Sequence, residues 1–224
     1  MYRMLDLFSG LCGASSAMRG DNRWEVVTVD FLEKFDTTIC ENIINLTPES
    51  FEEKEFDLIW ASPPCVCFSM SSVGHYWKKE AGVYLPRKKK TIEQLGLVYH
   101  TLWLINSLNP KWWFIENPKA MLRKFIGNPP GWVTYCQYGE DRMKPTDLWG
   151  THPPSFRYKH CYYRAKCHPP TPRGATVGTR GMKNSESAAK VPYLLSLAIK
   201  KAVESPGLPK RKLTSKLHNI KLEV

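Results

Sequence analysis

Two chemically reactive side chains stand where short apolar segments of this sequence end. Cys65 follows the segment FDLIWA (56–61) and a pair of prolines, and Glu116 lies near the end of KWWFIEN (111–117), before Pro118. Short apolar runs are typical of buried strands, and a proline cannot donate to a strand ladder, so the chain leaves the sheet there. Side chains at the carboxyl ends of such strands face the crevice where α/β proteins bind ligands. We therefore interpret Cys65 as a nucleophile and Glu116 as a second catalytic group; the alternative for Cys65 is a buried structural cysteine.

The segments before Cys65 predict elements that could position a ligand. Residues 3–8 read as a strand, followed by a turn of small residues and a helix at about 14–19, and residues 24–30 read as a second strand ending in Asp30. A strand, a glycine turn and a helix allow backbone N–H groups to approach a ligand. An acid at the end of the second strand commonly binds ribose hydroxyls; Asp30 could also cap a helix over 32–43.

The segments after Cys65 continue this alternation of strands and helices. Residues 69–90 show no period and predict a long mobile loop, whereas 91–108 and 191–204 have helical spacing of apolar residues. Residues 131–139 and 144–150 read as a strand pair. The alternation predicts an α/β fold with a mostly parallel sheet and helices on both faces.

Composition limits the function classes. The chain has 224 residues, 42% of them apolar, and a net charge of +11, which favours a polyanionic partner over a merely basic surface. It has no apolar run long enough for a membrane span. Seven cysteines and no pattern typical of a signal peptide favour free thiols in a reducing compartment, so we expect a cytoplasmic protein.

The motifs, taken in order, resemble those of the DNA (cytosine-5) methyltransferases, in particular the small versions carried by phages. The order is DLFSG, Asp30, SPPC, ENP and DRMK, followed by a late helix. The resemblance implies a Rossmann-like, S-adenosylmethionine-dependent methyltransferase fold. It also implies a prokaryotic cell or a phage-infected one as the setting, and double-stranded DNA as the partner.

The resemblance also implies roles for individual residues. It assigns catalysis to Cys65, Glu116, Arg142 and Lys144. It assigns cofactor binding to Phe8, Ser9, Gly10, Gly13, Asp30, Phe31, Asn42, Ile43 and Pro64. For nucleic-acid contact we add Ser69 and the basic run Arg87, Lys88, Lys89 and Lys90, which could instead be a solvated surface.

The chemistry of cytosine explains why these residue types are needed. A thiolate of Cys65 adding to C6 makes C5 nucleophilic enough to take a methyl group from a sulfonium. Glu116 would hydrogen-bond the base, and Arg142 could hold O2 and favour the thiolate. The target base must leave the duplex, and residues 69–90 are the expected gap-filling loop.

Departures from the family pattern leave alternatives open. Cys12 stands where the family has a glycine, Asn42 replaces an aspartate, and the region 151–183 is much shorter than a usual target-recognition domain. We therefore keep three alternatives: the same chemistry on RNA, a modified cofactor, and a non-catalytic DNA-binding relic. A monomer is expected, with a partner protein for target recognition as a further possibility.

The sequence divides into four expected parts. Residues 1–150 form the catalytic domain, 151–183 a short irregular insert, 184–205 a helix completing the domain, and 206–224 a basic tail. We expect no metal. The alternative is zinc held in the insert by His160, Cys161, Cys167 and His168, because four such ligands can stabilise a segment poor in apolar residues.

Overall fold

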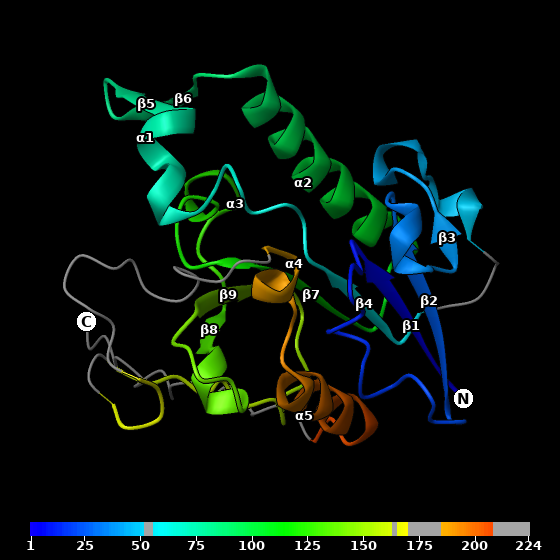
Figure 1. Cartoon of the computed structure of the whole chain (residues 1–224). Helices are drawn as coiled ribbons and strands as arrows, with labels where there is room; N and C mark the ends of the chain where they lie inside the picture. Colours follow the sequence, from blue (N-terminus) through cyan, green and yellow to red (C-terminus); the bar gives the residue numbers. More distant parts are fainter. Residues whose placement is uncertain (52–55, 163–164, 170–184, 208–224) are drawn as a thin grey trace, which may run out of the picture.

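A computed structural model describes residues 1–51, 56–162, 165–169 and 185–207. Its main element is a seven-stranded sheet in the order β3-β2-β1-β4-β7-β9-β8 (Figure 1). The strands are β1 (Tyr2–Leu7), β2 (Trp24–Asp30), β3 (Ile39–Cys40), β4 (Leu58–Ala61), β7 (Trp112–Pro118), β8 (Gly131–Thr134) and β9 (Pro145–Trp149). The helices are α1 (Val73–Tyr76), α2 (Lys89–Leu108), α3 (Arg123–Ile126), α4 (Ser185–Ala189) and α5 (Tyr193–Glu204).

The five strands from β3 to β7 run parallel, and β9 pairs antiparallel with both β7 and β8. Strand β1 lies between β2 and β4, with Leu7 opposite both Val29 and Ala61. The chain order therefore reverses direction at β1, which is the switch point where open α/β sheets bind ligands. The segments that follow β1, β2 and β4 leave the sheet at this one edge.

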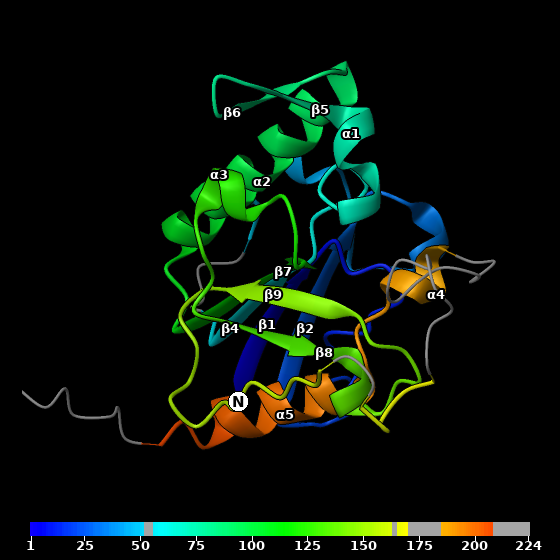
Figure 2. The ribbon, with the colours of Figure 1, turned by 90° about the vertical axis from the view of Figure 1, so that its left-hand side faces the viewer.

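Helices cover both faces of the sheet, as the sequence predicted. Helix α2 packs on one face with Val98, Leu104 and Ile105, and α5 packs on the other with Leu195 and Ile199. Figures 1 and 2 show α2 and α5 on opposite sides of the sheet. The central strands are consequently buried on both faces, which explains their continuous apolar sequences.

Two helices expected near the N-terminus are absent from the described residues. Residues 10–20 form consecutive turns in place of a helix at 14–19, and the region 32–43 forms two short 3-10 helices around β3. Serine side chains explain the first difference, because they compete for backbone groups. The Ser16 hydroxyl donates to Gly13 O at 2.7 Å, and Ser196 of α5 accepts from Ala17 N at 3.0 Å.

The expected loop at 69–90 has regular structure. A 3-10 helix and α1 lead into a hairpin of β5 (Trp77–Glu80) and β6 (Val83–Pro86). Ala81 and Gly82 both have positive φ, as a tight two-residue hairpin turn requires. The buried Trp77 anchors the hairpin against Phe68 and Phe125. Figure 2 shows the hairpin and α1 at the end of the molecule opposite α5.

The two later helices have the predicted form: the helix predicted at 91–108 is α2 and the helix at 191–204 is α5. The predicted strand pair is only partly correct. The strand at 144–150 is β9, whereas the strand expected at 131–139 ends at Thr134 as β8 and continues as the 3-10 helix η5 (Tyr135–Tyr138). Residues 151–162 and 165–169 contain neither helix nor strand, whereas residues 170–184 and the expected tail from 208 lie outside the described residues.

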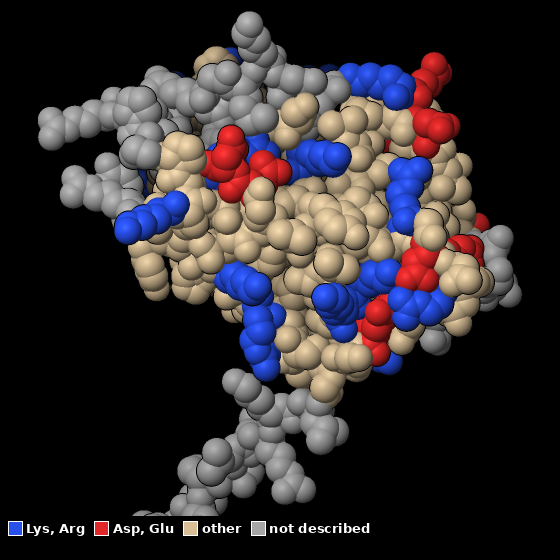
Figure 3. Space-filling view, turned by 60° about the horizontal axis from the view of Figure 1, so that its bottom comes forward, with Lys and Arg blue, Asp and Glu red and all other residues tan. Residues whose placement is uncertain are grey.

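Basic residues are scattered on the α5 side of the molecule. Figure 3 shows Lys and Arg there as isolated groups separated by uncharged surface and interspersed with acidic residues. The net charge of +11 is therefore not gathered into one patch on this face.

Candidate active site

Cys65 lies four residues beyond β4, in a turn that is held at several points. Its carbonyl accepts from Phe68 N at 2.9 Å and from Ser69 N at 3.0 Å. Just before it, Pro63 O accepts from the buried Asn117 side chain of β7 at 3.0 Å. Just after it, Cys67 N donates to Gln94 Oε1 of α2 at 3.1 Å, and Cys67 itself is buried. The half-buried thiol of Cys65 is thus carried by a backbone fixed on both sides.

Glu116 is buried near the end of β7 and has two partners from the neighbouring segments. The hydroxyl of Tyr135 donates to Glu116 Oε1 at 3.1 Å. The Nζ atom of Lys144 lies 3.6 Å from the same oxygen and 4.5 Å from the centre of the Tyr135 ring. Glu116 and Lys144 are 5% and 7% exposed, so this is a charge pair largely removed from water. Substituting either partner of such a pair strongly destabilises a protein, because the remaining charge would be buried without a counter-charge.

The thiol of Cys65 belongs to the same electrostatic cluster. Burial raises the pKa of Cys65 above its usual range; the nearby Lys144 ammonium lowers the pKa, and the Glu116 carboxylate raises it. Burial therefore favours the neutral thiol of Cys65, whereas the Lys144 ammonium favours its thiolate. Burial and the Glu116 carboxylate together raise the pKa of Tyr135 well above 10, so its phenol stays a proton donor.

Arg142, the other predicted basic residue, has different neighbours. Its Nε atom lies 3.3 Å from Glu140 Oε2, and its guanidinium donates to Ser187 O of α4 at 3.4 Å. Arg142 still acts electrostatically on Tyr135. The role that the sequence assigned to Arg142, stabilising the thiolate, stays a prediction; Lys144, also predicted to be catalytic, is a cation that lowers the pKa of Cys65.

A second group of predicted residues meets at the edge formed by β1 and β2. Asp30 accepts from Gly10 N at 3.0 Å through Oδ2 and from Leu32 N at 3.1 Å through Oδ1. Gly10 has φ +48, and the space where a Cβ would lie is open. The neighbouring Phe31 side chain is 60% exposed, so its ring is available to stack on a ligand. The backbone of Gly10, the carboxylate of Asp30 and the exposed ring of Phe31 thus all lie beside the switch point.

The turn after β1 is packed closely against the chain that leads into α5. A Cβ on Gly13 would lie 2.6 Å from both N and O of Val191, so only glycine fits. Beneath the turn, the Ser15 hydroxyl donates to the buried Asp6 carboxyl group at 2.6 Å. Cys12, the departure from the family glycine, has φ +52 and is buried. The position therefore does adopt a backbone conformation that favours glycine.

The remaining predicted cofactor residues follow β3 and β4 or precede Gly10. Asn42 is exposed and accepts from Ile44 N at 3.2 Å as the cap of a 3-10 helix, while Ile43 beside it is buried. Pro64 is half-buried beside Cys65, Phe8 has φ +58, and the Ser9 hydroxyl is buried without a hydrogen bond to any described residue.

The predicted nucleic-acid residues lie apart from the catalytic cluster. Arg87, Lys88, Lys89 and Lys90 are all exposed, the last two in the first turn of α2. Arg87 and Lys88 line a shallow groove together with Gly74, His75, Lys78 and Pro86. None of the residues that line this groove belongs to the Glu116 cluster. Ser69 is half-buried, and its hydroxyl pairs with that of Ser72 at 2.9 Å.

Tyr135 and Asn117 are site residues that the sequence reasoning missed. Tyr135 contacts Glu116 only because β8 reaches the sheet beside β9, which sequence spacing does not reveal. Asn117 could have been recognised, since it directly follows Glu116 in the motif and any side chain at a strand end can contact the next segment.

The sheet order, the turn at Gly10 and the acid that ends β2 define a Rossmann-like α/β fold. The family described as C-5 cytosine-specific DNA methylase matches residues 2–128. A Frog virus 3 (isolate Goorha) protein named "Probable DNA (cytosine-5)-methyltransferase" is 31% identical over 174 residues, which are 74% of this chain and 77% of the viral protein. The chain therefore belongs to the C-5 cytosine-specific DNA methylase family.

Solved structures with similar folds are longer than this chain. A Spodoptera frugiperda DNMT2 mutant is 20% identical with a TM-score of 0.45, covering 76% of this chain and 57% of its own. The Entamoeba histolytica methyltransferase EhMeth is 15% identical with a TM-score of 0.47, covering 67% and 53%. The chain thus spans a little over half the length of these proteins. Among the described helices, none is long and apolar enough to cross a membrane.

The residues at the β1–β2 edge fit the cofactor that methyltransferases generally use, S-adenosylmethionine. Asp30 offers carboxylate oxygens for a ribose, Phe31 an exposed ring for an adenine, and the open space at Gly10 lets backbone approach the ligand. The buried hydroxyl of Ser9, which lacks a hydrogen bond within the described chain, gives a further polar contact.

Proposed function

We propose that this protein transfers a methyl group from S-adenosylmethionine to C5 of cytosine in double-stranded DNA. The observation that carries the proposal is that three functional groups come together. Cys65 follows β4, Glu116 lies near the end of β7, and Lys144 is the last residue of the β8–β9 connection. The carboxylate and the ammonium come from two segments separate from that of Cys65, and both act electrostatically on its thiol. A stable fold does not need a buried carboxylate, a buried ammonium and a thiol together, whereas cytosine activation does.

Each residue in the cluster has a distinct part in the proposed reaction. Cys65 loses its proton, with Lys144 favouring the thiolate, and Sγ bonds to C6 of a flipped-out cytosine. Glu116, oriented by Tyr135 and Lys144, hydrogen-bonds the edge of the base and stabilises the electron-rich ring. The bound cofactor supplies an electrophilic methyl group. Loss of the C5 proton to water then re-forms the C5–C6 double bond and breaks the Cys65–C6 bond; Cys65 leaves as a thiolate, which takes a proton from solvent to restore the thiol.

We further propose that Arg87, Lys88 and the hairpin β5–β6 contact the DNA. The basic groove between α1 and the hairpin is lined by His75, Lys78, Arg87 and Lys88. The hairpin lies apart from the catalytic cluster, so a duplex held there would have to extend from the groove to the thiol. Phosphate contacts of this kind predict binding that weakens steeply with salt. We also propose that the protein acts as a monomer and that either the insert or a partner protein selects the target sequence.

Nucleoside analysis after incubation with labelled S-adenosylmethionine tests the proposed reaction. Wild-type protein with duplex DNA should produce labelled 5-methylcytosine, and Cys65→Ala should produce none while still binding DNA. Cys67→Ala is the matched control, because Cys67 is a buried cysteine two residues away whose thiol contacts Lys90 O. Label found only in RNA would mean that the substrate is RNA and not DNA. Equal activity of Cys65→Ala and wild type would refute the nucleophile.

A covalent trap tests the adduct separately. Fluorine at C5 cannot leave as a proton does, so DNA containing 5-fluorocytosine should remain bonded to Cys65 after methyl transfer. The adduct should survive denaturation, and peptide mapping should place it on Cys65. Turnover on ordinary DNA without trapping would argue against covalent addition.

A further inference from the structure

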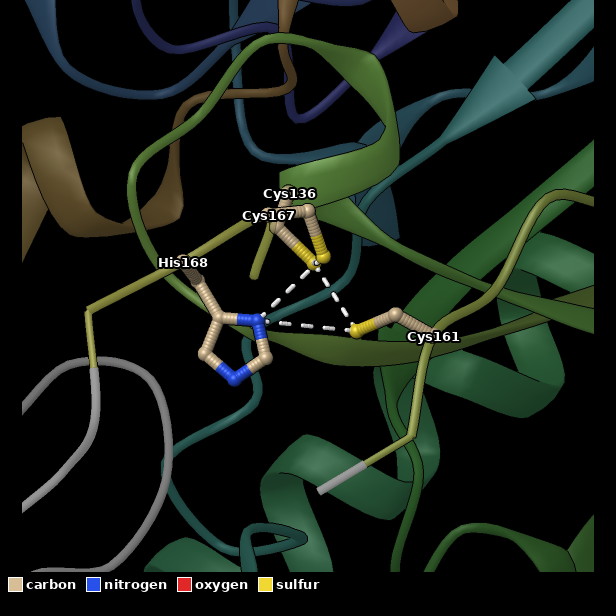
Figure 4. A group of neighbouring side chains, drawn as sticks. All are labelled: Cys136, Cys161, Cys167 and His168. Carbon is tan, nitrogen blue, oxygen red and sulfur yellow. Dashed lines mark hydrogen bonds between the residues drawn. The ribbon is translucent and has the colours of Figure 1, made fainter. Parts of the chain in front are cut away.

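Four potential metal ligands outside the catalytic cluster converge on one point between η5 (Tyr135–Tyr138) and the insert. They are Cys136, Cys161, Cys167 and His168, and their ligand atoms all lie within 4.8 Å of one another (Figure 4). Cys136 and Cys161 are buried, whereas Cys167 is exposed. From this geometry we infer a structural zinc site with three thiolates and one imidazole.

The spacing of the four atoms matches a tetrahedral zinc site. With Zn–S bonds of about 2.3 Å and Zn–N bonds of about 2.0 Å, a tetrahedron has edges of roughly 3.8 Å between sulfurs and roughly 3.5 Å from sulfur to nitrogen. Cys167 Sγ lies 3.7 Å from Cys136 Sγ and 3.4 Å from His168 Nδ1. Cys161 Sγ lies 3.7 Å from the same nitrogen and 3.1 Å from Cys136 Sγ. Three of these four edges agree closely, and the fourth is shorter than a zinc site requires, so the two thiols would separate on binding. The remaining two of the six edges are within 4.8 Å.

The ligand set differs from the one the sequence suggested. His160 is not part of the cluster, because its ring stacks on Trp132 of β8 with the ring centres 4.4 Å apart. Cys136, which lies 25 residues before Cys161, takes the fourth corner. Three thiolates and an imidazole favour zinc among the common metals, since oxygen-preferring ions such as magnesium avoid sulfur. Binding would release the three thiol protons to solvent.

The backbone around the cluster holds its two halves together without the metal. Thr134 N donates to Lys159 O at 3.1 Å, and Cys161 N donates to the Thr134 hydroxyl at 2.9 Å. Cys161 is therefore placed beside Cys136 by contacts that precede metal binding. The segment bearing Cys167 and His168 contains neither helix nor strand in its described part, so metal ligation would be its main tie to the domain.

The position of the site gives the metal a specific structural role. Cys136 directly follows Tyr135, whose hydroxyl donates to Glu116. A zinc ion there would fasten the insert, which replaces a full target-recognition domain, to the helix that orients the catalytic carboxylate. We expect the metal to be structural, because four protein ligands leave no open position for a substrate.

Metal analysis of the full chain, purified without a histidine tag or chelator, tests the zinc site. Wild-type protein should carry about one zinc per chain, and Cys161→Ser and Cys167→Ser should lose it. Cys40→Ser, an exposed cysteine of β3, and His160→Gln, the neighbour of Cys161, are matched controls that should keep the metal. Zinc loss in His160→Gln together with retention in Cys167→Ser would refute this ligand set.

Two further measurements do not depend on the folding of a variant. Cobalt(II) added to the metal-free wild type should give the visible absorption and the thiolate charge-transfer band of a tetrahedral site, and a chelator should lower the thermal unfolding midpoint. Wild-type protein that takes up neither metal would overturn the proposal. Peptide mapping that finds a disulfide between Cys136 and Cys161 in freshly isolated protein would overturn it as well.

Discussion

Replacing Tyr135 by phenylalanine isolates the hydrogen bond that orients Glu116. The substitution removes one hydroxyl, which donates to Glu116 Oε1 at 3.1 Å, and leaves the buried ring in place. A hydrogen bond to a charged group contributes about 1.5–3 kcal/mol. Because Lys144 Nζ remains 3.6 Å from the same oxygen, we expect the lower half of that range. A loss of about 1.5–2 kcal/mol from the transition state corresponds to a rate reduction of roughly 10- to 30-fold.

The assay is single-turnover methyl transfer at saturating DNA and cofactor, so that binding differences do not enter the rate. Tyr138→Phe is the matched control, because Tyr138 belongs to the same 3-10 helix and is also buried. Its hydroxyl donates to Arg157 O at 3.1 Å and accepts from Lys159 N at 3.2 Å, away from Glu116. Tyr138→Phe should therefore keep the wild-type rate of methyl transfer.

Two results would refute this reasoning about Tyr135. A Tyr135→Phe variant with the wild-type rate would mean that the hydrogen bond does not orient Glu116 during the reaction. Equal rate losses in Tyr135→Phe and Tyr138→Phe would trace the effect to the stability of the 3-10 helix. Thermal unfolding of both variants distinguishes this second case from a true active-site effect.

Three further predictions concern residues around the site. Burial raises the pKa of Asp6 to about 7, so the stability it contributes is complete below about pH 4 and is lost as the pH rises to about 7. The free energy of unfolding of the wild type should therefore fall between pH 4 and pH 8, and in Asp6→Asn this fall should be smaller by up to about 4 kcal/mol, as measured by urea unfolding at both pH values. A fall equal to that of the wild type would contradict the raised pKa of Asp6. Gly13→Ala should destabilise the protein by about 1–3 kcal/mol, because its Cβ would collide with the Val191 backbone. A thermal midpoint equal to that of wild type would contradict the close packing. Lys144→Met should move the pH midpoint of Cys65 alkylation upward, because Lys144 lowers the pKa of that thiol; peptide mass spectrometry follows Cys65 alone, and an unmoved midpoint would count against the cluster.

The amino-acid sequence determined the parts of this protein that depend on local pattern. Apolar runs and prolines predicted β4 and β7, and the order of motifs predicted the family and the α/β fold. Helical spacing predicted α2 and α5, which bury one face each. These features could be predicted because the periodicity of a buried strand or helix is written in consecutive residues.

Tertiary structure decided which side chains meet. The sequence after β1 predicted a turn of small residues and a helix at about 14–19, but hydrogen bonds to Ser196 and Asp6 hold that segment as turns. Lys144 lies beside Glu116, because β9 pairs with β7 and Lys144 directly precedes β9. Cys136 lies beside Cys161 because hydrogen bonds between Thr134 and the insert align the insert with β8. Such contacts depend on strand pairing between distant segments, which no local pattern encodes.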